Sequence, residues 1–539
     1  MTTLDRDIET LTLAKTAWAR LPLERKIAML EGLKPRIRAV AEEWVRAAVD
    51  AKGLRPGSPL AGEEWTSGPW AVLYAANRYL RTLRAIAGHG EPRLPPFRRR
   101  SDGRTVMRVF PHDLYDRVLL NGIAAEVWFQ PGVTPAQARA EAASFYRVPN
   151  PEGRVSLVLG AGNIASIAPL DVLYKLYAEG SVCVLKMNPV NAYLGPLLER
   201  AFEPFVEAGY LRFAYGGADA GAYLCAHPEV DEIHITGSAQ THDAIAAAVN
   251  KRITSELGNV SPTIVVPGAW SDADVEFQAQ NIATQKAHNA GFNCIASQVL
   301  ILPREWDRST QLVERVERIF AGMEQRPEYY PGAPQRRENL APGSSALRSV
   351  LRIDDPDRDR AAFVSEAFCG VLICVELPGD AETFLRNAVT FANERLHGTL
   401  GANLIAHPDT LRAHAAAIDR AIDALRYGCV GVNAWTGLGY FLAETPWGAY
   451  PGHTLADIQS GIGVVHNSYF LERTEKSVIR APFAPFPRSL STRERTLLPL
   501  PPWFVTNRRQ AEIGRALCDF EVHRTPALAA RVASIAMRA

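Results

Sequence analysis

Residues 155–165 read VSLVLGAGNIA, and they decide the fold class expected of this 539-residue chain. The first six are a short apolar run ending in Gly160, which is typical of a buried parallel strand. Two similar runs follow, VCVLK at 182–186 and EIHIT at 232–236, and a stretch with helical character precedes each of them. Strands separated by helices of this length predict βαβ units and a mostly parallel sheet, hence an α/β fold.

Further elements flank this stretch. The helices of the first series are expected at 169–178, 194–208 and 241–249, a fourth strand begins at Thr263, and a second series over 270–455 has strands at 299–303, 371–377 and 401–407. Apolar residues at helical spacing predict helices over 4–50, and the Pro- and Arg-rich residues 92–104 predict an exposed loop. The Pro-rich C-terminal part ends in a predicted helix over 507–518.

Composition limits the function class. Lys and Arg total 59 against 58 Asp and Glu, and this balance argues against a general nucleic-acid binder. The seven cysteines are scattered without CxxC spacing, so neither a disulfide framework nor a metal site is expected. The N-terminal residues lack the apolar core of a secretory signal, and no apolar run is long enough to span a membrane. These features predict a soluble, cytoplasmic protein.

The glycine-containing sequence GAGNIA (160–165) is the first candidate site. It fits the G-x-G-x-x-A pattern of a dinucleotide-binding turn that follows a strand. However, the next strand ends in Lys186, where the usual fingerprint has an acidic residue for the ribose hydroxyls. From these residues alone, a binding turn and a chance match both remain open.

Two further positions have residue types suited to covalent chemistry. Cys294 follows a small, polar turn in HNAGFNCIASQ (288–298), which favours an exposed thiol approached by backbone N–H groups. The other six cysteines stand in apolar or helical surroundings typical of small buried side chains. Glu256, in TSELGNVSP (254–262), stands at a sharp end of an element, where it is either a general base or a capping or surface residue.

These motifs follow one another in an order that resembles the aldehyde dehydrogenase superfamily. The resemblance begins with ITGS (235–238), SELGNVSP (255–262) and NAGFNC (289–294), which are similar to the family's Gly-Ser turn, Glu-Leu-Gly-Gly motif and Gly-x-x-Cys motif. It continues through SEAFCGVL (365–372), GCVGVN (428–433), ETPWGAYPG (444–452) and YFLERTEKSV (469–478), and it covers roughly residues 120–480.

The resemblance implies roles for individual residues. Cys294 would be the nucleophile, Asn163 and the Cys294 backbone N–H would hold the oxyanion, and Glu256 would activate water. The residues implied to bind the cofactor are Lys186, Gly237, Ser238, Leu257, Glu366 and Phe368. NAD-preferring members often carry Glu three residues after the lysine; this chain has Pro189 there, so NAD and NADP are both open.

The expected architecture is an aldehyde dehydrogenase-like fold with a Rossmann-type dinucleotide-binding domain, an α/β catalytic domain and a small oligomerisation β element. The expected segments are an N-terminal helical part (1–113), an oligomerisation segment (114–149), the dinucleotide-binding domain (150–257), the catalytic domain (258–455), an oligomerisation strand (456–480) and a Pro-rich extension (481–539). The resemblance also implies a homodimer or homotetramer in which residues near 465–478 add a strand to a partner.

The implied reaction is oxidation of an aldehyde to a carboxylic acid. A CoA-acylating or acyl-CoA-reducing relative and a non-catalytic scaffold with the same fold are the alternatives. The sequence departs from the family pattern at His242, Asn259 and Cys369, each of which replaces a glycine. Four aromatic residues are expected either to wall an apolar substrate tunnel or to belong to the core: Trp435, Tyr440, Phe441 and Trp447.

Overall fold

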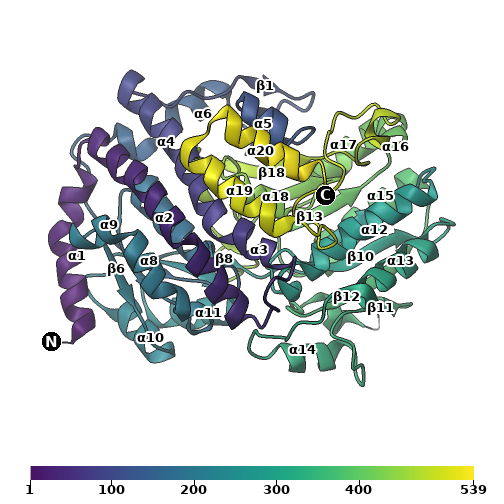
Figure 1. Cartoon of the computed structure of the whole chain (residues 1–539), viewed down its shortest axis with the longest axis horizontal. Coiled ribbons are helices and arrows are strands. Elements are labelled where there is room, and N and C mark those ends of the chain that lie inside the picture. The colour runs from purple at the N-terminus through teal and green to yellow at the C-terminus, as the bar shows by residue number, and fades with distance from the viewer. Residues whose placement is uncertain (1, 358) are drawn as a thin grey trace.

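The computed structural model of the chain describes residues 2–357 and 359–539 (Figure 1). Met1, in the predicted N-terminal part, and Arg358, in the predicted catalytic domain, lie outside the described residues. The described part contains a six-stranded sheet, a ten-stranded sheet and a two-stranded ribbon. Most neighbouring strands in the two large sheets are parallel, and the predicted α/β class is confirmed.

The six-stranded sheet contains the stretch around Val155. Its strand order is β16 (Gly461–Ile462), β8 (Arg252–Leu257), β7 (Glu232–Gly237), β4 (Val155–Leu159), β5 (Val182–Lys186) and β6 (Leu211–Ala214). All pairs are parallel except β16 with β8. The main helices between these strands are α7 (Ile167–Tyr177), α8 (Gly195–Ala201), α9 (Glu203–Glu207), α10 (Ala218–Ala226) and α11 (Ala239–Ala248).

The single helix predicted over 194–208 is wrong. The chain forms α8 and α9 instead, with Phe202 between them outside helical geometry. Pro204 stands in the first turn of α9, and proline has no N–H to continue a helix through this point. The other two helices predicted in this series are confirmed as α7 and α11.

The ten-stranded sheet combines strands from residues 97–129 with strands that follow β8. Its strand order is β1 (Phe97–Arg99), β2 (Thr105–Phe110), β3 (Ala124–Phe129), β18 (Thr474–Arg480), β14 (Cys429–Val432), β13 (Gly401–Ile405), β9 (Ser261–Val265), β10 (Ser297–Pro303), β12 (Val371–Leu377) and β11 (Ser349–Ile353). Alternate residues of the central strands face opposite layers, as the period of a strand requires. Ile264 packs in the cluster with α15 (Ala381–Arg395) and α17 (Ala415–Ala424), whereas Val265 packs in the cluster with α12 (Asp272–Ala287) and α13 (Ser309–Gly322).

Strand β18 occupies a position inside this sheet. It pairs in parallel with β14, where Val430 lies opposite Val478, and antiparallel with β3, where Val127 lies opposite Ser477. Both of its edges are therefore hydrogen-bonded within the chain, and the addition of a strand to a partner by residues near 465–478 stays a prediction. The exposed loop predicted over 92–104 is wrong in part, because β1 pairs with β2 there, with Phe97 opposite Met107.

The N-terminal region forms a helical layer. It consists of α1 (Thr3–Ala19), α2 (Leu23–Ala51), α3 (Ala61–Trp65) and α4 (Ala71–His89), and the helices predicted over 4–50 are confirmed as α1 and α2. A capping box at Thr2 begins α1, and Trp18 near its end is fully buried. The Trp18 indole donates to the carbonyl of Leu176, which ties α1 to the end of α7.

The C-terminal tail is part of this helical layer. Its helix α19 (Gln510–His523) packs on α3, α2 and α4, as the yellow and purple ribbons in Figure 1 show, and α20 (Pro526–Ala536) packs on α19 and α5 (Leu114–Leu119). The approach of α19 to α3 is close, because a Cβ on Gly62 would lie 2.0 Å from the Cβ of Gln510. The tail is therefore a packed element and not a solvent-exposed linker. The helix predicted over 507–518 begins and ends later, and α20 was not predicted.

The remaining helices complete the layers, and their bounds are α5 (Leu114–Leu119), α6 (Pro135–Glu141), α14 (Ala333–Leu340), α16 (Pro408–Ala413) and α18 (Gly437–Phe441). The two-stranded ribbon joins β15 (Pro446–Trp447) to β17 (Val465–His466). Among the described helices, none is both long and apolar enough to cross a membrane. The described residues also contain no group of three or more His, Cys, Asp or Glu side chains placed to hold a metal ion.

Candidate active site

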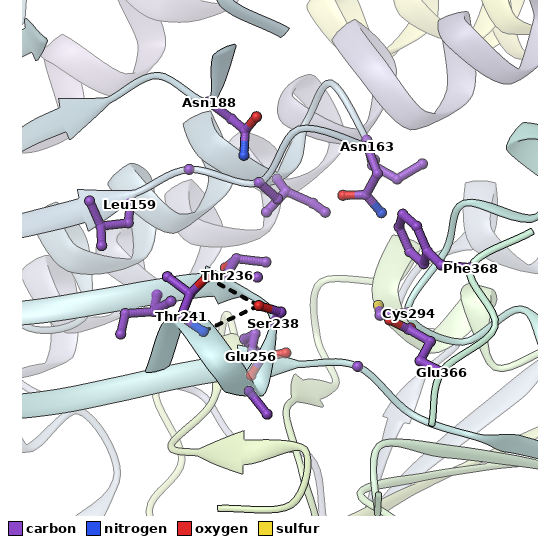
Figure 2. A pocket seen from close by; sticks show the side chains of 18 of the residues that line it. Leu159, Asn163, Asn188, Thr236, Ser238, Thr241, Glu256, Cys294, Glu366 and Phe368 are labelled. Carbon is purple, nitrogen blue, oxygen red and sulfur yellow. Dashed lines mark hydrogen bonds between the residues drawn. The ribbon is translucent and has the colours of Figure 1, made fainter. Parts of the chain in front are cut away.

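A cavity of about 1060 Å³ lies where the two large sheets meet. Its walls come from the carboxyl ends of β4, β5 and β7, from the end of β8, and from the loops around Cys294, Glu366 and Trp435. The carboxyl ends of parallel strands are the usual place for ligands in open α/β sheets. Figure 2 shows the side chains of Asn163, Glu256 and Cys294 around this cavity, each from a different segment of the chain.

The turn before Cys294 has a left-handed backbone. Asn289, Ala290 and Gly291 have φ values of 52°, 57° and 87°. A Cβ on Gly291 would lie 2.5 Å from the carbonyl oxygen of Cys369, so this position requires glycine. The turn directs the Cys294 side chain to the cavity, and Cys294 is partly exposed whereas the other six cysteines are buried. The contrast predicted among the cysteines is confirmed.

The surroundings of Cys294 favour the neutral thiol over the thiolate. Burial raises its pKa well above the ordinary value, and the nearby carboxyl groups of Glu366 and Glu256 raise it further. The backbone N–H groups of Cys294 and Ile295 lie close enough to the sulfur to lower the pKa in part. The nucleophile therefore has to lose a proton when it attacks, and these N–H groups can stabilise the negative charge on sulfur.

Asn163 presents its amide to the same cavity. It follows β4 in the GAGNIA sequence and is 7% exposed. Its Nδ2 donates to the carbonyl oxygen of Phe292 at 2.9 Å, a bond that fixes the amide beside the Cys294 turn. An amide nitrogen carries two donors, so one N–H remains for a substrate oxygen in the cavity.

Replacing Asn163 by alanine is expected to lower kcat about 10²–10³-fold, as loss of one oxyanion donor does. The fold should persist, because the removed contact is a single side-chain bond to the Phe292 carbonyl. Steady-state turnover of the variant, compared with its circular dichroism melting curve, tests this. A variant that melts normally and turns over at the wild-type rate would exclude Asn163 from the chemistry.

Glu256 is a buried carboxyl group without a hydrogen-bond partner. It lies on β8, one residue before the strand ends, and is 5% exposed. Neither of its oxygens has a partner among the described residues. Burial, followed by the charge of Asp171, raises the pKa of Glu256 well above its usual range. Unpaired oxygens beside a cavity and a raised pKa are properties of a general base that takes a proton from water.

The other end of the cavity fits a dinucleotide. Lys186 ends β5, and Gly237 and Ser238 join β7 to α11; all three line the cavity. The Ser238 hydroxyl accepts from the backbone N–H of Thr241, as the dashed line in Figure 2 marks, and so caps α11 beside the cavity. Small residues leave a flat slot on this side: Gly217, Ala218, Gly221, Ala222, Ala244 and Ala248.

His242 does not obstruct this end. Its side chain is fully buried in α11 and is not among the residues that line the cavity. The wall at this turn is formed by residues 237–241 instead. Replacement of the family's second turn glycine by histidine therefore leaves the dinucleotide end open.

Glu366 and Phe368, two further residues predicted to bind the cofactor, line the cavity, whereas Leu257 does not. Glu366 lies against the chain at Gly258, where a Cβ would come within 2.5 Å of its Oε2. Burial raises the pKa of Glu366 to about 7. Phe368, which has a φ of 41°, also lines the cavity, close to Cys294 in Figure 2. The side chain of Leu257 is buried and takes no part in the lining.

Aromatic side chains form much of the wall near Cys294. Trp435, Tyr440, Phe441 and Trp447 all line the cavity, although three of them are also largely buried. Both interpretations left open by the sequence therefore apply. These rings belong to the core, and they also form part of the cavity wall.

The sequence did not indicate several polar residues of the site. Ser67, Asp171, His288 and Arg336 line the cavity, and Lys52, Glu63 and Glu64 lie behind it. The sequence does contain a signal for Lys52: it stands four residues after Ala48 and three residues after Val49, which are both on the apolar face of the helix. That spacing places Lys52 on the buried face of α2, where an unpaired lysine would be very costly.

Comparisons with known proteins agree with the predicted resemblance. Residues 131–342 match the family model described as "Aldehyde dehydrogenase family". The structure is similar to that of a putative aldehyde dehydrogenase from Burkholderia cenocepacia, with 20% identity, a TM-score of 0.59, and 88% of this chain and 91% of that chain covered. It is also similar to gamma-glutamyl-gamma-aminobutyraldehyde dehydrogenase from Burkholderia cenocepacia J2315, with 19% identity, a TM-score of 0.61, and 88% of each chain covered.

A third similar structure is aldehyde dehydrogenase C from Pseudomonas syringae, determined as a variant in complex with NAD+ and octanal. It is 18% identical over 89% of each chain, with a TM-score of 0.58. The aldehyde dehydrogenase-like fold is confirmed, and the family model agrees with the resemblance of the ordered motifs over residues 131–342.

Proposed function

We propose that this chain, which has the fold of the aldehyde dehydrogenases, oxidises an aldehyde to the carboxylic acid and transfers the hydride to NAD or NADP. The observation that carries the proposal is one cavity lined by the thiol of Cys294, the amide of Asn163 and the unpartnered carboxyl of Glu256. Its other end has the Lys186 and Ser238 features suited to a dinucleotide.

The residues divide the reaction between them. Cys294 attacks the aldehyde carbon, and the Asn163 amide with the Cys294 backbone N–H stabilises the negative oxygen that forms. When bound, the nicotinamide dinucleotide supplies the hydride acceptor. Loss of the hydride leaves a thioester on Cys294, and Glu256 takes a proton from the water that hydrolyses it. One aldehyde and one water thus give one carboxylic acid, with two electrons transferred as hydride and one proton released.

The experiment is a turnover assay with short, long and aromatic aldehydes, each with NAD and with NADP. We expect formation of reduced nicotinamide together with an equal amount of carboxylic acid, and the preferred dinucleotide decides between the two cofactors. Oxidation that requires CoA and yields acyl-CoA instead of acid would indicate the CoA-acylating alternative. A protein that binds a dinucleotide but turns over no aldehyde or acyl-CoA would be the non-catalytic scaffold.

The predicted cytoplasmic location and the homodimer or homotetramer stay predictions. Strand β18 is paired with β14 and β3 of its own chain. Sedimentation velocity over a range of protein concentrations measures the oligomeric state directly.

A further inference from the structure

A buried lysine lies directly behind the nucleophile and the oxyanion donor. Lys52 follows the end of α2, and its side chain is 3% exposed. Its Nζ donates to both oxygens of Glu64 at 2.8 and 2.9 Å, to Oδ1 of Asn289 at 3.0 Å and to the backbone carbonyl oxygen of Asn163 at 3.2 Å. A single ammonium group of the N-terminal helical layer thus contacts both segments that carry the proposed chemistry.

The groups that Lys52 contacts are also bound to each other. The Asn289 amide nitrogen lies 3.0 Å from the carbonyl oxygens of both Asn163 and Phe292, and the Asn163 side chain donates to the same Phe292 carbonyl. The Tyr329 hydroxyl lies 3.1 Å from the Asn163 carbonyl and 3.0 Å from Asn289 Oδ1. The GAGNIA segment and the Cys294 turn are therefore joined through one network centred on the Lys52 ammonium.

A second buried ion pair holds the start of the same turn. Glu63 accepts from the backbone N–H of Asn289 at 2.9 Å and from Arg326 at 2.8 Å. Arg326 also donates to the carbonyl of Ala287 at 3.0 Å. Asn289 has the left-handed φ of 52° noted above, so these bonds fix a backbone conformation that is uncommon outside glycine and that asparagine tolerates better than most residues.

Stability alone does not account for such a cluster. Removing two charges from water costs several kcal/mol per ion, and a well-packed apolar pair is often equally or more stable. The ion pair instead fixes the orientation of the groups that it contacts, because each of its hydrogen bonds has a defined partner and geometry. Catalytic groups need support of this kind if they are to stay in place as charge develops on the substrate.

We propose that Lys52 and Glu64 are positioning residues that hold the Asn163 amide and the Cys294 turn in register as one oxyanion site. Glu64 keeps the ammonium in place, and Lys52 fixes the Asn163 carbonyl and the Asn289 side chain. The N-terminal helical layer thereby acts on the chemistry through Asn163 and Cys294 without reaching the substrate. This inference rests on the proposed function.

The test uses Lys52→Met, the double variant Lys52→Met/Glu64→Gln, and Lys476→Met as a matched control. Lys476 is another buried lysine, and its Nζ donates to backbone carbonyls of Ile422, Asp423 and Leu425 at 3.1, 2.9 and 2.6 Å. Both single variants should lower the melting temperature. Only Lys52→Met should lower kcat, by about 10–10²-fold, which is less than loss of a whole oxyanion donor costs. The KM for the dinucleotide should not change.

The double variant separates positioning from stability. It removes both charges, so no unpaired ion stays buried, and most of the lost melting temperature should return. The carbonyl of Asn163 and the side chain of Asn289 still lack the ammonium donor of Lys52, so kcat should stay low. Recovery of kcat together with the melting temperature would show that the pair only stabilises the fold and would overturn the proposal.

Alkylation of Cys294 by iodoacetamide gives a readout that does not depend on aldehyde oxidation. At a fixed pH, Lys52→Met and the double variant should react several-fold more slowly than wild type, because the backbone N–H groups that stabilise the thiolate are less well placed. Lys476→Met should react at the wild-type rate. Equal alkylation rates in the wild type and the three variants would overturn the inference, whether or not the chain oxidises an aldehyde. Failure of the positioning role can therefore be distinguished from failure of the proposed function.

Discussion

Replacement of Cys294 by alanine abolishes formation of reduced nicotinamide from every aldehyde, with a loss of kcat on the order of 10⁴-fold or more. The loss is large because the proposed route is covalent, and no other described cysteine lines the cavity near the Asn163 amide and the Glu256 carboxyl. The measurement is steady-state absorbance of the reduced nicotinamide with the best aldehyde found.

Cys518→Ala is the matched control for this variant. Cys518 is fully buried in α19, far from the cavity lining, and its loss should leave turnover intact. Dinucleotide binding by Cys294→Ala, followed by fluorescence quenching, should also persist because the binding end of the cavity is unchanged. Substantial aldehyde oxidation by Cys294→Ala would disprove the thioester route.

Replacement of Glu256 by glutamine stops the reaction after one turnover. The amide cannot accept a proton from water, so the thioester on Cys294 should persist and steady-state turnover should fall about 10²–10⁴-fold. Rapid mixing is expected to show a burst of reduced nicotinamide equal to the enzyme concentration, and intact mass spectrometry should show the acyl group. A variant with no burst would place Glu256 before hydride transfer and would contradict its assignment to hydrolysis.

The pH dependence of the wild-type protein follows from the same carboxyl group. Burial and the charge of Asp171 raise the pKa of Glu256, so its ionised form, the one that acts as a base, is scarce at low pH. Thioester hydrolysis should therefore accelerate as pH rises from the ordinary carboxyl range through the raised pKa. Glu256→Gln should show no such rise in hydrolysis over the same range, because the titrating base is gone.

The sequence predicted the local elements best where the residue pattern is itself the cause of the structure. The run VLICVEL forms β12 over Val371–Leu377, because a run of five apolar residues rich in β-branched side chains suits a strand covered on both faces. The catalytic candidates were found for a similar reason. Cys294 and Glu256 stand at sharp ends of elements, and such ends are visible in the glycine and proline around them.

The rest depended on contacts between distant parts of the chain. Lys52 and Glu64 belong to helical segments whose local pattern does not reveal that their partners are Asn163 and Asn289. The C-terminal helix α19 packs on the N-terminal layer, a contact for which no local periodicity gives a signal. The prediction of a single helix over 194–208 was wrong because the spacing of apolar residues was given more weight than Pro204.

The position of β18 between β3 and β14 also sets the order in which the chain can be completed. Residues Ala124–Phe129 leave the ribosome long before Thr474–Arg480, a delay on the order of tens of seconds at ~5–20 residues per second. During that time one edge of β3 has no partner, and an unpaired strand edge is a site of aggregation. The strand that closes the ten-stranded sheet is thus synthesised late, so a nascent chain released before residue 480 carries an open β edge.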